Sequence, residues 1–119
     1  MPGPWPAGPG GAGFLWELTD LCEGSAIDSM WFSDRLSSPI AVPEVMTTLA
    51  AIAARTSRLK FGPSVLVLPY RNPTVAAKEM ATIDYLSGSR LLPAVGIGVE
   101  LPKEFEASGV PFKERGRRT

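Results

Sequence analysis

Apolar positions along the chain switch repeatedly between helical and strand-like spacing. Helical spacing is found over three stretches, which are residues 14–23, Pro43 to about residue 55, and residues 73–87. Apolar runs with little polar alternation lie between and after them, at residues 29–33, 56–68 and 90–98. The pattern predicts buried strands that alternate with helices.

Local signals set the ends of these helices. Asn72 is a candidate N-cap of the third helix, Pro73 suits its first turn, and Ser87-Gly88 ends it. Pro43 likewise suits the first turn of the second helix. The apolar face predicted for the third helix consists of Val75, Ala76, Met80, Ile83 and Leu86.

Strands that recur about every 30 residues, with a helix between each pair, have the spacing of βαβ units. Such units form parallel sheets, because the connecting helix returns the chain to the same end of the sheet. We therefore predict an α/β domain over residues 14–119, either a doubly wound sheet or a β/α barrel. Residues 1–13, "MPGPWPAGPGGAG", are rich in Pro and Gly and are predicted to be irregular.

The second predicted strand is interrupted within "FGPSVLVLPYRNP", residues 61–73. Gly62-Pro63-Ser64 stands near its start, and a polar segment from Pro69 to Pro73 closes it. These residues alone favour an ordinary β-bulge with a trans peptide bond. The closing segment is interpreted as the turn that leads into the third helix.

Composition mainly excludes classes of function. The chain has 119 residues, of which 45% are hydrophobic and 20% charged, with a formal net charge of zero, as in globular domains. No basic excess points to nucleic acid, and no apolar run approaches the roughly 20 residues that span a bilayer. The single cysteine, Cys22, favours a reducing setting, so we expect a cytoplasmic protein.

The chain contains no His. This absence excludes a His-based triad and a His-ligated metal, and with a single Cys it also excludes a structural zinc site. We therefore expect no metal, and chemistry is left to carboxylates, Arg, Lys, Tyr or a bound cofactor.

Polar or flexible residues follow the predicted strands, where ligands bind in parallel α/β folds. Asp34 and Arg35 follow the first strand, and the third ends in "GIGVE", which contains Gly96, Gly98 and Glu100. Asp34 can orient a substrate or cofactor group, and Arg35 can supply charge to an anionic one. Periodicity alone favours the alternative, a helix-capping or loop-stabilising Asp beside a surface Arg. The glycines either admit a planar ligand to the main chain or serve close backbone packing.

Four stretches, taken together and in order, resemble the luciferase-like monooxygenase family. They are "IDSMWFSDRL", "PEVMTTLAAIAARTSRLKFGPSVLVLPYRNP", "AKEMATIDYLSGSRLLPAVGIGVE" and "PKEFEASGVPFKERGRRT". The similarity is greater to the actinobacterial branch of coenzyme F-420-dependent oxidoreductases, and it covers residues 14–119. It implies a (β/α)8 TIM barrel, of which this chain supplies strands two to four, so that the barrel is incomplete in this chain.

The resemblance also implies a cofactor, which is the deazaflavin coenzyme F-420 or, as the alternative, FMN. Ser64-Val65 matches a non-prolyl cis peptide bond that forms a bulge behind the ring in the deazaflavin branch. Asp34 matches a strand-end Asp of the cofactor and substrate site. Gly96, Gly98 and Glu100 match a loop that borders the cofactor.

One position departs from the family pattern. Many members have a His, which serves in catalysis or substrate binding, where this chain has Arg35. Full-length relatives are often dimers, so the resemblance also implies a homodimer for the full-length protein.

Two functions of different classes follow. The first is an oxidoreductase that transfers hydride between a deazaflavin, or reduced FMN with oxygen, and a small organic substrate. Its catalytic candidates are Asp34 and Arg35, and its cofactor-binding candidates are Ser64, Val65, Gly96, Gly98 and Glu100. The alternative is a non-catalytic, truncated half-barrel that acts only by pairing with another chain, or is inactive.

Overall fold

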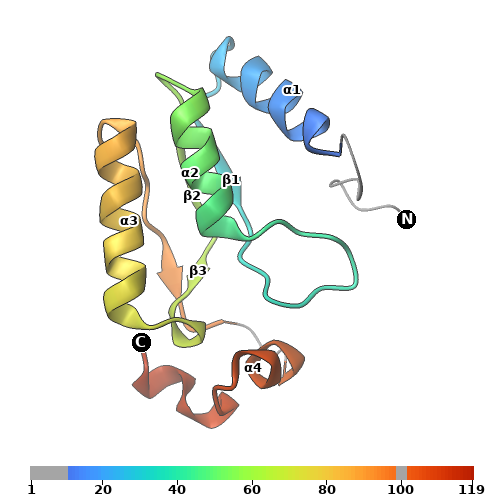
Figure 1. The fold of residues 1–119 in the computed structure, drawn as a ribbon, viewed down its shortest axis with the longest axis vertical. Helices are drawn as coiled ribbons and strands as arrows, with labels where there is room; N and C mark the ends of the chain where they lie inside the picture. Colours follow the sequence, from blue (N-terminus) through green and yellow to red (C-terminus); the bar gives the residue numbers. More distant parts are fainter. Residues whose placement is uncertain (1–10, 99–101) are drawn as a thin grey trace.

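The structure of the chain is a computed structural model that describes residues 11–98 and 102–119. Its α-helices are α1 (Ala12–Glu23), α2 (Val45–Arg55), α3 (Pro73–Ser87) and α4 (Pro102–Ser108). Its strands are β1 (Ser29–Phe32), β2 (Lys60–Pro63), β3 (Leu66–Val67) and β4 (Val95–Gly96). Two 3₁₀ helices, η1 (Leu68–Tyr70) and η2 (Phe112–Arg117), complete the described elements. Figure 1 shows the expected alternation of helices and strands, with β2 and β3 in succession.

All strand pairings within the described residues are parallel, which confirms the predicted α/β class. β1 pairs with β2 over its full length, beginning with Ser29 opposite Lys60. β3 pairs in the same sense with β4. An isolated parallel bridge between Phe61 and Leu91 joins β2 to the segment that leads into β4. The three predicted strands therefore lie next to one another in chain order.

The second and third predicted strands are shorter than expected. The second is divided into β2 and β3 at Ser64-Val65, and the residue after β3 already belongs to η1. The third forms only β4 and the bridge at Leu91. Proline lacks the N–H that a ladder needs, and Pro69 and Pro93 each remove such a donor at these places.

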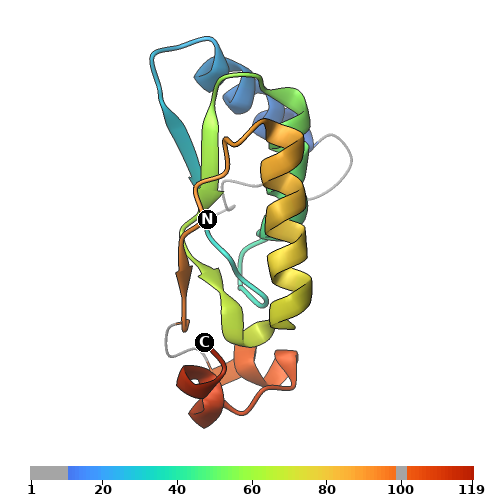
Figure 2. The ribbon, with the colours of Figure 1, turned by 90° about the vertical axis from the view of Figure 1, so that its left-hand side faces the viewer.

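Helices α2 and α3 pack against each other on one side of the strands (Figure 1, Figure 2). The core lies between the two layers, and its completely buried side chains include Leu49, Ile52, Leu59, Phe61 and Leu66. Figure 2 shows no described helix on the opposite side of the strands. Trp31 alternates with the buried Met30 and Phe32 of β1, so it points to that side, and it is 48% exposed.

Side-chain caps begin the two central helices. Pro43 does not lie in the first turn of α2, as the sequence predicted, but just before its N-cap, Glu44. The Glu44 carboxylate accepts the N–H groups two and three residues further on, at 3.1 and 2.7 Å, and thus satisfies free donors of the helix. Asn72 caps α3 in the same way, and Gly88 ends that helix with a φ of 66°, both as predicted.

Arg90 joins the end of α3 to α2 and to the segment before β2. Its five N–H donors all have acceptors, which are Ser87 O, Thr56 Oγ1, Leu59 O, Ala53 O and Thr56 O, at 2.6 to 2.9 Å. The guanidinium group also lies over the ring of Phe61, 5.4 Å from its centre. This arginine is therefore part of the scaffold beneath the strands.

Glu23 and Arg58 attach α1 to the rest of the fold. The Glu23 carboxylate accepts the backbone N–H groups of Ser57, Arg58 and Leu59 at 2.8 to 2.9 Å. Burial raises the pKa of Glu23, but these hydrogen bonds outweigh it and lower that pKa to about 2. Arg58 returns the contact by donating to carbonyl groups at the end of α1, including that of Cys22 at 2.9 Å.

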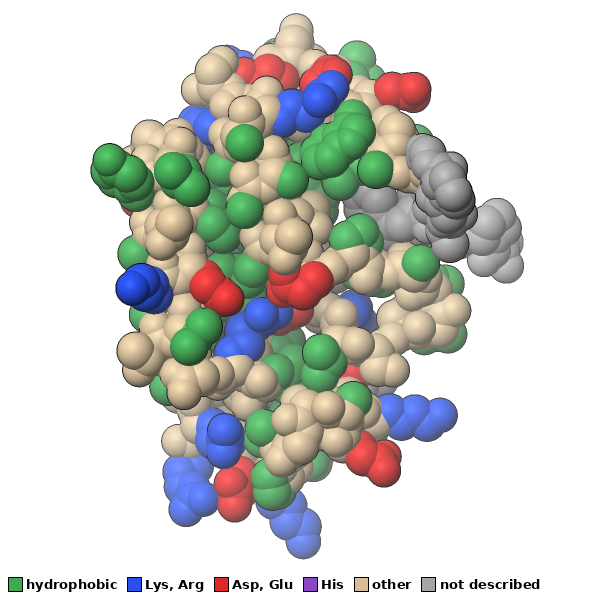
Figure 3. Space-filling view, in the orientation of Figure 1, with side chains coloured by type: hydrophobic (Ala, Val, Ile, Leu, Met, Phe, Trp, Pro, Cys, Tyr) green, Lys and Arg blue, Asp and Glu red, His purple; other side chains and the backbone are tan. Residues whose placement is uncertain are grey.

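Charges of both signs are interspersed on the face of the molecule shown in Figure 3. Arg71 and Glu44 form an ion pair, 3.0 Å apart. Within residues 11–98 and 102–119, no helix combines the length and the apolar character that crossing a bilayer requires.

Candidate functional site

The carboxyl ends of the strands border a small cleft of about 290 Å³. Six of the seven residues predicted for the site line it, which are Asp34, Arg35, Ser64, Val65, Gly96 and Gly98. The seventh, Glu100, lies outside the described residues. Residues separated by more than 60 positions in the sequence are therefore brought together where a parallel α/β fold binds ligands.

The peptide bond between Ser64 and Val65 is cis. This agrees with the family resemblance and not with the trans bulge that the residues alone favoured. The strand pairing continues on both sides of the bond, because Ser64 N donates to Phe32 O at 2.7 Å and Leu66 N donates to Ala94 O at 2.8 Å. Val65 is 39% exposed, and its side chain forms part of the cleft wall.

The two predicted glycines of the cleft occupy positions with little space for a side chain. A Cβ atom at Gly96 would lie 2.8 Å from Cγ2 of Val65. Gly98 has a φ of 83°, and a Cβ atom there would lie 2.9 Å from Cγ1 of Val67 and 3.4 Å from the ring of Phe105. Glycine therefore lets the chain after β4 pass close to β3 at the edge of the cleft.

Asp34 is buried, and both of its carboxylate oxygens have protein partners. Oδ2 accepts the N–H of Val67 at 2.9 Å, and Oδ1 accepts Nη2 of Arg71 at 2.9 Å. The same Nη2 also reaches Glu44, the N-cap of α2. Asp34 thus joins the end of β1 to β3 and to the segment after η1, in agreement with the loop-stabilising interpretation.

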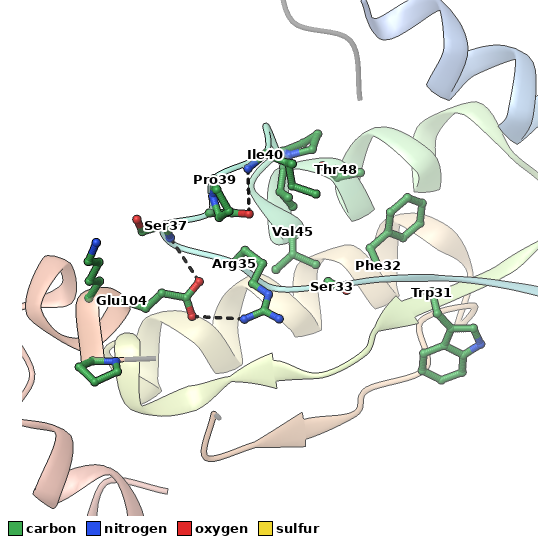
Figure 4. A pocket seen from close by; sticks show the side chains of 15 residues that line it. Trp31, Phe32, Ser33, Arg35, Ser37, Pro39, Ile40, Val45, Thr48 and Glu104 are labelled. Carbon is green, nitrogen blue, oxygen red and sulfur yellow. Dashed lines mark hydrogen bonds and ion pairs between the residues drawn. The ribbon is translucent and has the colours of Figure 1, made fainter. Parts of the chain in front are cut away.

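Arg35, the residue after Asp34, also lines the cleft. Its side chain is 38% exposed, and Nη1 lies 3.8 Å from Oε2 of Glu104. Glu104 comes from α4, and its side chain is only 3% exposed. It also accepts the hydroxyl of Tyr70 at 2.9 Å. Figure 4 shows its contacts with Arg35 and with the N–H of Ser37, which donates at 3.4 Å.

Glu104 affects the ionisation of Tyr70. Burial raises the pKa of the Tyr70 hydroxyl above its ordinary value, and the hydrogen bond to Glu104 raises it further. The negative charges of Glu104 and Asp34 act in the same direction. Tyr70 therefore keeps its proton at neutral pH and acts as a hydrogen-bond donor.

The sequence reasoning missed Arg71, Tyr70 and Glu104 as parts of the site. Arg71 and Tyr70 lie in the segment that we interpreted as a turn, and a Tyr-Arg pair between two prolines was the available signal. Glu104 offered no such signal, because it is one of several charged residues in a short helix. Only the fold brings it next to Arg35, which follows β1.

A second, larger cleft of about 820 Å³ adjoins the first and shares Ser33, Arg35 and Glu104 with it. Figure 4 shows its lining from β1, from the loop between β1 and α2, and from the start of α2. The lining is largely apolar and includes Trp31, Phe32, Pro39, Ile40 and Val45. Within the described part of the chain, no group of His, Cys, Asp or Glu is placed to hold a metal ion.

Comparisons with known proteins assign the fold. A family model described as "Luciferase-like monooxygenase" matches residues 2–119. A coenzyme F-420-dependent glucose-6-phosphate dehydrogenase of Amycolatopsis mediterranei is 36% identical over 112 residues, which are 87% of this chain and 33% of that protein. The chain spans between 26% and 33% of the length of curated relatives that it matches.

Two solved structures have a similar fold. The coenzyme F-420-dependent tetrahydromethanopterin reductase of Methanopyrus kandleri has a TM-score of 0.70 and 26% identity, and the match covers 92% of this chain and 28% of that one. The oxygenating constituent of 3,6-diketocamphane monooxygenase of Pseudomonas putida, solved with FMN, has a TM-score of 0.83. Its identity is 20%, so it speaks for the fold alone, over 97% of this chain and 34% of that one.

These relatives are oxidoreductases and monooxygenases, so the family is one of enzymes. The matched structures are TIM barrels, and the parallel strands and helices described above form part of such a barrel. The chain belongs to the luciferase-like monooxygenase family.

Proposed function

We propose that this chain forms one wall of the cofactor site of a flavin- or deazaflavin-dependent oxidoreductase that acts on a small organic substrate. The observation that carries the proposal is the convergence of six predicted residues on one cleft at the carboxyl ends of the strands. The comparisons support it, because the relatives named as F-420-dependent are redox enzymes and a structure of the same fold contains FMN.

The described residues fit one side of a planar ring. Gly96 and Gly98 let the chain after β4 lie close to Val65 and Val67 at the edge of the cleft, and Val65 supplies an apolar surface there. A cleft of about 290 Å³ is at the lower limit of the roughly 300–1,000 Å³ of small-molecule sites, so it holds part of such a ring. When bound, the cofactor supplies the hydride chemistry for which the side chains of this chain have no group.

Each residue of the cleft has a definite task in this proposal. Asp34 positions the segment that contains Val67, because its two oxygens accept from Val67 N–H and from Arg71. Arg35 offers N–H donors to an oxygen of the ligand, since Glu104 occupies only one of its nitrogens. The apolar second cleft, which shares Arg35, is the proposed place of the organic substrate.

Coenzyme F-420 is the proposed cofactor, and FMN is the alternative. The support for F-420 is the 36% identical relative and the Methanopyrus structure, both named as F-420-dependent. The support for FMN is the Pseudomonas structure, which contains it. Full-length relatives lead us to propose a homodimer for the whole protein, in which further segments complete the site.

Titration of the ¹⁵N-labelled chain with F-420 and with FMN tests this proposal, because amide shifts detect even the weak binding expected of one wall. We expect saturable shifts at Val65, Gly96 and Gly98, with F-420 bound more tightly than FMN. A Gly98→Val variant should lose these shifts, whereas Gly109→Val, remote from the cleft, should retain them. Shifts spread over other surfaces, or none, would contradict the proposal and favour the non-catalytic alternative.

A further inference from the structure

The charges of the site are paired within the protein. Asp34 pairs with Arg71 at 2.9 Å, and Arg35 pairs with Glu104 at 3.8 Å. Arg71 also pairs with Glu44 at 3.0 Å. Three carboxylates and two guanidinium groups therefore leave one formal negative charge on this cluster. Among the described residues that line the smaller cleft, no cation is without a carboxylate partner.

Glu104 is held firmly in this arrangement. Its carboxylate faces three donors, the Tyr70 hydroxyl, the Ser37 N–H and the Arg35 guanidinium, and its side chain is 3% exposed. The ring of Tyr70 packs edge-on against Phe105, the next residue of α4, with 4.8 Å between ring centres. The negative charge thus has a fixed position beside Arg35, in a place where water screens it little.

A fixed carboxylate next to Arg35 changes which ligand groups this arginine accepts. An anionic group that approaches Arg35 also approaches the Glu104 carboxylate, and the repulsion offsets the attraction. A neutral carbonyl oxygen experiences little repulsion and still receives a hydrogen bond from a free N–H of Arg35. Arg35 is 38% exposed and has no other partner among the described residues, so such donors remain available.

Resting on the proposed function, we propose that Glu104 is a specificity-determining residue that neutralises Arg35 and thereby selects a neutral, carbonyl-bearing group at this end of the cleft. Phosphate and carboxylate groups of the cofactor or substrate are excluded from Arg35 and bind elsewhere. This proposal differs from the expectation from the sequence, in which Arg35 supplied charge to an anionic group.

The test compares the wild-type chain with Glu104→Gln and Tyr70→Phe. The Gln side chain keeps an oxygen that accepts from Tyr70 and Ser37 but removes the charge. Tyr70→Phe removes a hydrogen bond and keeps the charge, so it controls for a merely structural effect. The titrants are inorganic phosphate, riboflavin, and FMN, which is riboflavin with a phosphate, and the readout is the ¹⁵N shift of Arg35 Nε in each protein.

Inorganic phosphate should bind at Arg35 about tenfold more tightly in Glu104→Gln than in the wild type at low salt. The difference should shrink as salt is added, because the charges are screened. Tyr70→Phe should stay within about twofold of the wild type. Equal phosphate affinity in wild type and Glu104→Gln, or an equal gain in Tyr70→Phe, would overturn the proposal.

The two flavins show whether the cofactor itself supplies the excluded anion. Wild type should bind riboflavin at least as tightly as FMN, and Glu104→Gln should shift this preference toward FMN. If the wild type bound FMN about tenfold more tightly than riboflavin, with the FMN phosphate at Arg35, the proposal that Glu104 excludes anionic groups from Arg35 would be overturned. If neither flavin binds to any variant, the FMN alternative fails, the F-420 titration decides the proposed function, and the phosphate titration still decides the role of Glu104. Glu104→Met removes the same charge and repeats the test if Glu104→Gln does not fold.

Discussion

The carboxylate of Asp34 accepts the backbone N–H of Val67 at 2.9 Å, across 33 positions of sequence. This hydrogen bond fixes the end of β1 to β3 two residues after the cis bond at Ser64-Val65. A second bond, to Arg71, extends the same link toward the start of α3. One buried side chain therefore controls how three segments meet at the cleft.

Replacement of Asp34 should destabilise the fold, because it leaves Val67 N–H without an acceptor and Arg71 with only the half-exposed Glu44. We expect Asp34→Ala to lower the free energy of unfolding by about 3 kcal/mol. Asp34→Asn, which keeps one acceptor oxygen, should cost about 1–2 kcal/mol. Urea denaturation followed by circular dichroism measures both.

Asp28→Ala is the matched control, because Asp28 is an exposed carboxylate that pairs with Lys60 at 3.4 Å. It should cost less than about 0.5 kcal/mol. If Asp34→Ala were no more harmful than Asp28→Ala, Asp34 would not hold the segments together.

Substitution of Gly98 should combine two separate costs. A φ of 83° is unfavourable for any residue with a Cβ atom, and that atom would also lie 2.9 Å from Cγ1 of Val67. We expect Gly98→Ala to cost about 2–3 kcal/mol, against about 1 kcal/mol for Gly109→Ala, where φ is 70° but no atom lies within 4 Å. Thermal or urea unfolding of the two variants measures the difference.

The double variant Gly98→Ala with Val67→Ala isolates the steric part. Removal of the Val67 methyl groups should relieve the steric contact with the Cβ atom introduced at position 98. The two substitutions should therefore be non-additive by about 1 kcal/mol. Additive costs would show that the backbone conformation alone requires glycine at this position.

Features that depend on local chemistry could be predicted from the sequence. The cap at Asn72, the end of α3 at Gly88 and the parallel βαβ order follow from the residues themselves and are confirmed. The apolar face of α3 was only partly correct, because Val75 and Leu86 are 53% and 66% exposed. Helical spacing defines an apolar stripe, but it does not say how much of the stripe a neighbour covers.

The candidate site was predictable only where it follows the strand ends. Asp34, Arg35 and Gly98 were found because parallel strands end at one edge of a sheet, and the structure brings them to the same cleft. The partners of Asp34 and Arg35 were not found, because Arg71 and Glu104 come from distant segments. No local pattern reveals which of 12 acidic and 12 basic residues will meet in space.

Arg90 should be intolerant of Lys, although the charge is conserved. Its five N–H groups reach four carbonyl oxygens and one hydroxyl, and a Lys ammonium offers only three donors from one point. We expect Arg90→Lys to lower the free energy of unfolding by about 2–3 kcal/mol, as measured by urea denaturation.

Arg55→Lys provides the comparison, because Arg55 makes a bidentate pair with Asp20 at 2.7 and 2.8 Å on the surface. That substitution should cost less than about 1 kcal/mol. Similar losses in the two variants would mean that the network around Arg90 contributes no more than a surface ion pair.

Glu23 should make stability depend on pH in the acid range. Its folded-state pKa is about 2, against an ordinary value of 4.5, because three backbone N–H groups of residues 57–59 donate to the carboxylate. A lowered pKa means that the stabilisation is complete above about pH 4.5 and is lost as the pH falls toward 2. Solvent screening limits this stabilisation by Glu23 to about 1 kcal/mol.

Glu23→Gln gives the measurement, since an amide cannot ionise and supplies only one oxygen to these donors. Urea denaturation at several pH values should give the wild type a free energy of unfolding about 1 kcal/mol higher than that of Glu23→Gln at pH 7. This difference should become progressively smaller between pH 4.5 and 2. A difference that stays constant through this window would place the effect of Glu23 in packing. It would then follow that the attachment of α1 to the segment before β2 does not depend on an ionised carboxylate.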